Sequence, residues 1–164
     1  MNRRTHTLRP PRRSGFTIVE AVVLISIVGI IAAVAAPRFL ALSEMDAARA
    51  HRQALADFRY AQRVSANSGC PVQVDFGIGL YTLTRRTNCR SGAYSQPMVD
   101  PVSNTTPYSV TLPIGVAITS SVDPLVFDAL GRATTTAGVV SSVSIAVGPH
   151  ALEAIGETGL VRVP

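Results

Sequence analysis

The sequence contains no lysine and no tryptophan, and aromatic residues make up only 5% of its 164 residues. Because single-stranded nucleic acids are bound largely by aromatic stacking, this scarcity makes a base-stacking platform a poor interpretation. Charged residues are also few, at 15%, whereas hydrophobic residues reach 47%, which is apolar for a soluble domain. The composition therefore predicts one concentrated apolar segment.

Arginine supplies all of the formal positive charge, and its distribution is uneven. Five of the 15 arginines precede Gly15, where the chain has no acidic residue. The remainder holds 15 − 5 = 10 arginines against 10 acidic residues, a balance of zero. The net charge of +5 thus belongs to a short N-terminal tail. A polybasic tail beside an apolar helix is typical of the cytoplasmic side of a membrane segment.

Only two cysteines are present, Cys70 and Cys89. In a reducing compartment they would be unpaired core residues, whereas in an exported domain they would form one disulfide. Closing a loop of this size contributes about 3 kcal/mol in the chain-entropy model. Two thiols without a neighbouring histidine are too few for a zinc site.

Residues 16–36 form an apolar run interrupted by Thr17, Glu20 and Ser26. As a helix this run is about 31 Å long, close to the hydrocarbon thickness of a bilayer. It predicts a transmembrane helix, which could be a permanent anchor or a secretory signal cleaved at Ala33-Val34-Ala35. A third origin is a leader that is cut before the apolar run, so that the helix is retained.

Glu20 distinguishes these three origins. A carboxylate in an apolar zone is costly unless it is paired, so such residues are usually functional. Cleavage between Gly15 and Phe16 would create an amine one helical turn from Glu20, on the same subunit or a neighbour. The alternative is a carboxylate that snorkels to the lipid headgroups.

The segment from Gly15 through Phe16 to Glu20, followed by the apolar run, resembles the class III leader of type IV pilins and type II secretion pseudopilins. In that family a prepilin peptidase cuts after the glycine and N-methylates the new terminal residue, here Phe16. The resemblance implies that Glu20 helps the subunit enter a filament. Pro37 matches a proline that kinks the helix in many members, as the loss of a backbone hydrogen bond would explain.

The resemblance also implies a domain organisation, partners and a location. Residues 1–15 would be the leader, 16–36 the transmembrane and filament-core helix, 37–66 an amphipathic helix and 67–164 an antiparallel β domain. The expected fold is α+β and pilin-like, with the long helix packed on the sheet. The chain would sit in the bacterial inner membrane with its β domain in the periplasm. Its partners would be membrane lipid, prepilin peptidase, an inner-membrane assembly platform and other pilin or pseudopilin subunits.

The second half of the helix is predicted from its pattern as well. Residues 38–66 lack glycine and proline, and one apolar face carries Ala54, Leu55, Phe58 and Ala61. The polar residues are expected on the other faces, and these are Arg49, Arg52, Gln53, Asp57 and Arg63. The polar, glycine-ending segment of residues 67–69 predicts the end of the helix.

Beyond Cys70 the pattern changes to short β-rich runs. Residues 72–76 and 80–84 alternate around a glycine-rich turn, which predicts a hairpin with both cysteines at its open end. Residues 90–107 are predicted to be a surface loop. Further strands are expected at residues 108–112, 116–119, 125–128 and 139–147, and a last hairpin at 151–155 and 160–163. Their close spacing favours antiparallel sheets.

Two C-terminal motifs narrow the resemblance. Phe127-Asp128 with Gly131-Arg132 resembles the FDxxGR-like segment of GspH/FimT-type minor pilins, and the ending with Gly156, Gly159 and Arg162 resembles the last hairpin of that group. Residues 37–55 and Cys70-Pro71 are also similar to MSHA-type minor pilins. Physically, Gly131 suits a turn with positive φ, and Asp128 can hydrogen-bond the turn backbone.

Little in the sequence indicates catalysis, a metal or a cofactor. His6, His51 and His150 are scattered, and each is expected to face solvent. Asp123 and Asp128 could form an acid pair, but Pro124 between them favours turn roles. Gly77 and Gly79 lack the following helix of a phosphate-binding loop. We therefore expect no enzyme activity.

The leading hypothesis is a structural minor pilin or minor pseudopilin of a type IV pilus or type II secretion system. An alternative is a tip-located module for DNA uptake or adhesion, in which Arg85, Arg86 and Arg90 contact phosphates. A third is a cleaved periplasmic protein unrelated to pili, whose mature chain would start at Ala36 or Pro37.

Overall fold

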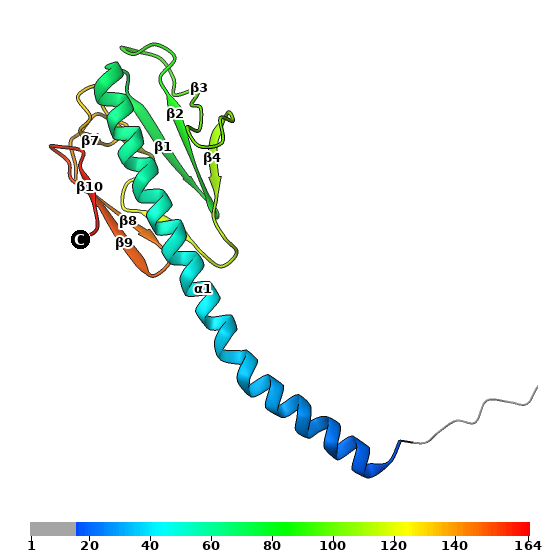
Figure 1. Cartoon of the computed structure of the whole chain (residues 1–164). Coiled ribbons are helices and arrows are strands. Elements are labelled where there is room, and N and C mark those ends of the chain that lie inside the picture. Colours follow the sequence, from blue (N-terminus) through cyan, green and yellow to red (C-terminus); the bar gives the residue numbers. More distant parts are fainter. Residues whose placement is uncertain (1–15) are drawn as a thin grey trace, which may run out of the picture. The chain divides into compact units, whose positions relative to one another are not determined.

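The computed structural model describes residues 16–164, and the side chains of residues 33–42 lie outside the described part. The predicted leader, including His6 and Gly15, is also outside it. The chain divides into two compact units, Met1–Leu40 and Ala41–Pro164, which are described separately. The helix α1 (Ile18–Ser68) contributes residues to both units (Figure 1).

Within residues 16–164, the chain after α1 forms ten strands. They are β1 (Val72–Gly77), β2 (Leu80–Arg85), β3 (Gln96–Pro97), β4 (Tyr108–Thr111), β5 (Ile118–Ser120), β6 (Leu125–Phe127), β7 (Ala133–Thr134), β8 (Val143–Val147), β9 (His150–Ala154) and β10 (Val161–Arg162). The first sheet has the order β3-β2-β1-β6-β7, with β4 sharing one edge of β2 with β3. The second has the order β10-β9-β8-β5. All strand pairs are antiparallel, and the predicted α+β class is confirmed.

The second part of α1 packs on the sheets through small side chains. Phe58 is fully buried at the centre of this face, and the other buried apolar positions of α1 are Ala47, Ala50, Ala54 and Ala61. Alanines at helical spacing let the helix approach the sheets closely. Phe58 meets Tyr81 edge-on, with 5.2 Å between ring centroids, and Phe76 at 5.9 Å. The predicted amphipathic face is thus confirmed, although Leu55 is only partly buried.

The predicted end of α1 is also confirmed. The helix ends at Ser68, and Gly69 follows with φ 65°, the left-handed conformation that commonly closes a helix. Pro37 lies among the residues whose side chains are outside the described part. The kink at Pro37 stays a prediction.

Most of the expected strands are present, with three differences. The first hairpin is confirmed as β1 and β2, and the last as β9 and β10. The segment predicted to be a surface loop contains β3, whose two exposed residues pair with the end of β2 and carry no alternating pattern. The predicted strand at residues 139–147 begins only at Val143, because Thr135 and Val139 close a turn before it. The two-residue strand β7 was not predicted.

Candidate functional site

The first unit carries a helical segment that is apolar on every side. Every residue from 16 to 32 is exposed, including the large side chains of Phe16, Ile18, Ile25 and Ile30 at 67–85% of their full exposure. A helix that is hydrophobic all round requires an apolar environment or apolar partners. Within residues 16–164, no helix has the length and hydropathy that crossing a membrane requires. The predicted transmembrane span, residues 16–36, includes residues 33–36, whose side chains lie outside the described part.

Glu20 lies in the first turn of this helix, where Thr17 is the N-cap. The Thr17 Oγ1 accepts a hydrogen bond from the Glu20 backbone N–H at 3.2 Å, and the Thr17 carbonyl accepts from the Ala21 N–H at 3.1 Å. Thr17 and Glu20 therefore have the spacing of a capping box, in which the acidic residue at the third helical position favours the helix start. This signal is visible in the sequence as Thr-x-x-Glu, although the capping role of Thr17 was not predicted. An acidic residue suits this first turn, independently of the role in assembly that the sequence predicts for Glu20.

The second unit holds a buried carboxylate whose predicted position on the helix was wrong. Asp57 was expected on a polar face of α1, yet it is only 8% exposed. The Tyr81 hydroxyl donates to its Oδ2 at 2.5 Å and the Tyr108 hydroxyl to its Oδ1 at 2.7 Å. These bonds connect α1 with β2 and β4. Tyr81 and Tyr108 lie at strand positions whose side chains point toward α1. Two hydroxyls on that face of the sheet are the sequence signal for a polar partner on the helix.

The electrostatics of this cluster follow from its burial. Burial raises the pKa of Asp57 above its ordinary value, and the two tyrosine hydrogen bonds oppose that change. Burial and the neighbouring carboxylate raise the pKa of both Tyr81 and Tyr108. The hydroxyls therefore remain donors, and the cluster joins α1 to the first sheet.

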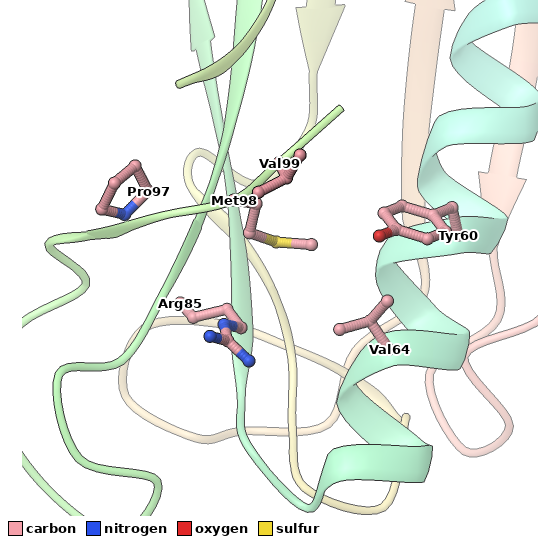
Figure 2. A pocket seen from close by; sticks show the side chains of 6 residues that line it. All are labelled: Tyr60, Val64, Arg85, Pro97, Met98 and Val99. Atoms are coloured by element: carbon pink, nitrogen blue, oxygen red, sulfur yellow. The ribbon is translucent and has the colours of Figure 1, made fainter. Parts of the chain in front are cut away.

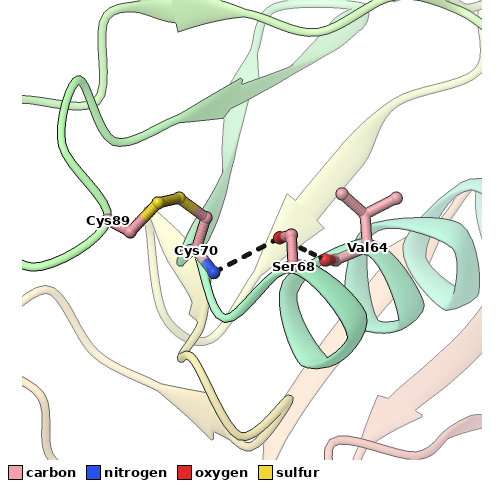
Figure 3. The surroundings of a disulfide bond; sticks show 4 residues. All are labelled: Val64, Ser68, Cys70 and Cys89. Carbon is pink, nitrogen blue, oxygen red and sulfur yellow. Dashed lines mark hydrogen bonds between the residues drawn. A yellow bond between two sulfur atoms is a disulfide. The ribbon is translucent and has the colours of Figure 1, made fainter.

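The open end of the first hairpin is closed by a disulfide between Cys70 and Cys89, with Cα atoms 4.3 Å apart (Figure 3). The Ser68 hydroxyl donates to the Val64 carbonyl at 2.6 Å and accepts from the Cys70 N–H at 3.3 Å. The disulfide thus fixes the loop after β2 next to the C-terminal end of α1.

The two C-terminal motifs meet at one place in the structure. The Asp128 carboxylate accepts from the Leu130 and Arg132 N–H groups, each at 2.9 Å, and forms an ion pair with the Arg132 side chain at 2.8 Å. Gly131 has φ 78°, as the turn requires. A Cβ on Gly159 would overlap the Gly131 carbonyl. The FDxxGR-like turn and the last hairpin turn are therefore packed backbone against backbone.

Side chains of α1 hold this pair of turns. The Arg59 Nε donates to the Val161 carbonyl at 2.8 Å, and the Gln62 amide donates to the Thr158 carbonyl at 3.5 Å. Arg162 and Glu153 form an ion pair across β9 and β10 at 2.8 Å. These contacts give the C-terminal motifs a structural role.

The described histidines do not both face solvent. His51 is only 8% exposed, which corrects the expectation from sequence, and its Nε2 lies 3.1 Å from the Ala151 carbonyl. Its ring lies 5.1 Å from that of His150, which is partly buried. Among residues 16–164, no group of three or more histidine, cysteine, aspartate or glutamate side chains could hold a metal ion.

Asp123 and Asp128 serve separate turns. The Asp123 Oδ1 accepts from the Phe76 N–H at 3.4 Å, whereas Asp128 is engaged by its own turn.

The three arginines near Cys89 do not share one surface. Arg85 lines a hollow of about 210 Å³ with Tyr60 and Val64 of α1 and with Met98 (Figure 2). Arg86 lines a different hollow, and Arg90 is exposed. Adjacent residues of an extended chain point to opposite faces, which explains the separation.

The described part of the chain is thus a pilin-like α+β fold, with one long helix and antiparallel sheets. Among solved structures it is similar to the minor pseudopilin EpsH from the type 2 secretion system of Vibrio cholerae, with a TM-score of 0.55 and 12% sequence identity. The similarity covers 72% of this chain and 94% of that one, so the fold is that of a minor pseudopilin. No protein-family model and no curated protein matches the chain.

Proposed function

We propose that the chain is a minor pilin or minor pseudopilin, a structural subunit of a type IV pilus or type II secretion pseudopilus. The observation that carries this proposal is the helical segment of residues 16–32, which is exposed on every side and largely apolar, in a chain whose fold is similar to that of a minor pseudopilin. Such a segment is stable when it packs against like helices or lies in lipid. Filament assembly supplies the first environment and the inner membrane the second.

The processing steps of this proposal rest on the leader. Prepilin peptidase would cut between Gly15 and Phe16 and methylate the Phe16 amine, and the inner-membrane platform would then assemble the subunit with its β domain in the periplasm. Glu20 would pair with a terminal amine of its own or a neighbouring subunit. The function is structural, with no catalytic step.

N-terminal sequencing and intact mass of the chain, produced with a prepilin peptidase, test the processing. The expected product starts at N-methylated Phe16, and an inactive peptidase leaves the leader in place. A mature chain that starts at Ala36 or Pro37 would contradict the proposal and favour a cleaved periplasmic protein.

Assembly is tested with Glu20→Ala and Glu20→Val. We expect both variants to accumulate in the membrane fraction and to be missing from sheared filaments, because the terminal amine has lost its counter-ion. Normal incorporation of either variant would overturn the pairing role of Glu20.

The DNA-binding alternative needs several cations on one surface, since phosphates are spaced along the strand. Arg85 and Arg86 line separate hollows, and this separation favours the structural subunit over a DNA-binding tip module.

A further inference from the structure

Arg86 is a cation without an acceptor in the part of the chain that the structure describes. Its Nε is buried and has no hydrogen-bond partner, and its guanidinium forms no ion pair with residues 16–164. The guanidinium lies over the ring of Tyr94, whose centroid is 5.1 Å from Cζ. A buried donor left unpaired destabilises the protein, so such a group calls for an explanation.

This arginine lines a hollow of about 170 Å³, which we call the Arg86 pocket. It lies between the loop after β2, strand β6 and the turn after β7. The residues of its lining that matter here are Arg86, Tyr94, Asp128, Thr134, Thr135 and Gly138.

Three other polar side chains of this lining already have partners. The Thr134 hydroxyl donates to the Val126 carbonyl at 3.1 Å, and the Thr135 Oγ1 accepts from the Val139 N–H at 3.3 Å. The Asp128 carboxylate is held by Arg132. The Arg86 Nε is therefore the buried donor of this lining that has no acceptor among the described residues.

The chemistry of the pocket favours a carboxylate as that acceptor. A guanidinium presents parallel N–H groups that match the two oxygens of a carboxylate, and a ring stacked on its face leaves those edges free. The hollow is smaller than the roughly 300–1,000 Å³ of drug-sized ligand sites, so it fits one small group. A nucleic-acid strand brings further phosphates that need further cations, and Arg86 is the one cation in the lining of this pocket.

We propose that the Arg86 pocket binds a carboxylate group of a partner protein, with the Arg86 guanidinium donating to its oxygens over the Tyr94 ring. The carboxylate could come from an acidic side chain or from a chain terminus. The proposal does not depend on the proposed function, because the pocket lies within Ala41–Pro164 and its binding can be measured without a filament.

The test uses the full chain in detergent micelles, with NMR observation of the Arg86 Nε–H and Gly138 N–H signals. The probes are N-acetylglutamate α-amide for a side-chain carboxylate, N-acetylalanine for a terminal carboxylate, and N-acetylglutamine amide as the neutral isostere. Inorganic phosphate is titrated in parallel. We expect saturable shifts with at least one carboxylate, and affinity about tenfold or more weaker for the neutral probe.

Three variants test whether carboxylate binding depends on the Arg86 guanidinium. Arg86→Gln is expected to abolish the shifts of Gly138, and Arg86→Lys to weaken binding about tenfold because the parallel donors are lost. Arg90→Gln, which changes an exposed arginine of the same loop, should bind as the unchanged protein does. Near-ultraviolet circular dichroism checks that each variant is folded. If Arg86→Gln does not fold, Arg86→Lys still tests the proposal.

The proposal is overturned if neither carboxylate gives saturable shifts, or if the neutral probe binds equally well. It is also overturned if Arg86→Lys binds as tightly as the unchanged protein. Phosphate binding that is tenfold tighter than that of both carboxylates would instead assign the pocket to a phosphate group.

Discussion

Asp57 places one carboxylate between two buried tyrosine hydroxyls, and each of its oxygens accepts one hydrogen bond. Asp57→Ala would leave both hydroxyls buried without an acceptor. We expect the free energy of unfolding to fall by about 2–6 kcal/mol, from a cost of about 1–3 kcal/mol for each of the two unsatisfied hydroxyls. Thermal unfolding of the full chain in micelles, followed by circular dichroism, measures the change.

A matched control is Asp75→Ala, since Asp75 is only partly buried and accepts from the Gln73 amide two residues away. Its expected effect is within about 0.5–1 kcal/mol. Equal destabilisation by the two variants would show that the hydrogen bonds of the tyrosine cluster contribute no more to the free energy of unfolding than that of Asp75 does.

The same carboxylate predicts a pH dependence. Burial raises the pKa of Asp57 in the folded protein, so the folded state binds this proton more tightly than the unfolded state does. The resulting stabilisation is complete below the unfolded pKa of about 3.9 and is lost as the pH rises through the folded pKa. The test compares the melting temperature of the unchanged protein with that of Asp57→Asn at each pH. We expect the first value minus the second to decrease as the pH rises from about 4. A difference that is constant or increases with pH would contradict this prediction.

At the scale of elements, two facing turns join the C-terminal motifs. Gly159 has φ 64°, and a Cβ there would overlap the Gly131 carbonyl. Gly138 has φ 80°, but a Cβ there would meet nothing within 4 Å. Gly138→Ala thus isolates the cost of the left-handed backbone, about 1–2 kcal/mol. Gly159→Ala adds a backbone overlap that no side-chain movement relieves.

We expect Gly159→Ala to lower the melting temperature clearly more than Gly138→Ala does, and to reduce amide protection in β10 and at Arg132. Hydrogen exchange of the full chain measures both. Similar effects of the two substitutions would mean that the turns separate at little cost.

The elements differ in how far the sequence determines them. The helix face of Ala54, Phe58 and Ala61 is predictable because its spacing alone defines it, and so is the first hairpin, whose alternation continues on both sides of its turn. Strands β3 and β7 have two residues each, too few for any pattern, and they exist because a neighbouring strand offers an edge.

The candidate sites also differ in how far the sequence predicts them. The exposed apolar segment and Glu20 are evident from composition and position. The burial of Asp57 depends on Tyr81 and Tyr108, which are distant in the chain, and no pattern within α1 contains that information. The separation of Arg85 from Arg86, in contrast, follows from the alternation of an extended chain.

At the scale of the whole molecule, the apolar segment gives Glu20 two physical roles that can be separated. As an acidic residue in the first turn after the Thr17 cap, it would favour the helix start, and as a carboxylate it would neutralise a terminal amine during assembly. Thr17→Ala removes the cap, at a cost of about 0.5–2 kcal/mol, and leaves the carboxylate in place. Glu20→Gln keeps a side chain that suits a capping box and removes the charge.

If charge pairing governs assembly, Glu20→Gln should be missing from sheared filaments, whereas Thr17→Ala should be incorporated at close to the normal level. If the helix start governs it, Thr17→Ala should be the more defective of the two. Quantitative immunoblotting of filament and membrane fractions separates these outcomes, with processing at Phe16 checked by mass so that a cleavage defect is not counted as an assembly defect. We expect the first result, because a lost cap frays only the first turn, whereas an unpaired amine would be buried among the apolar side chains of residues 16–32 in every assembled subunit.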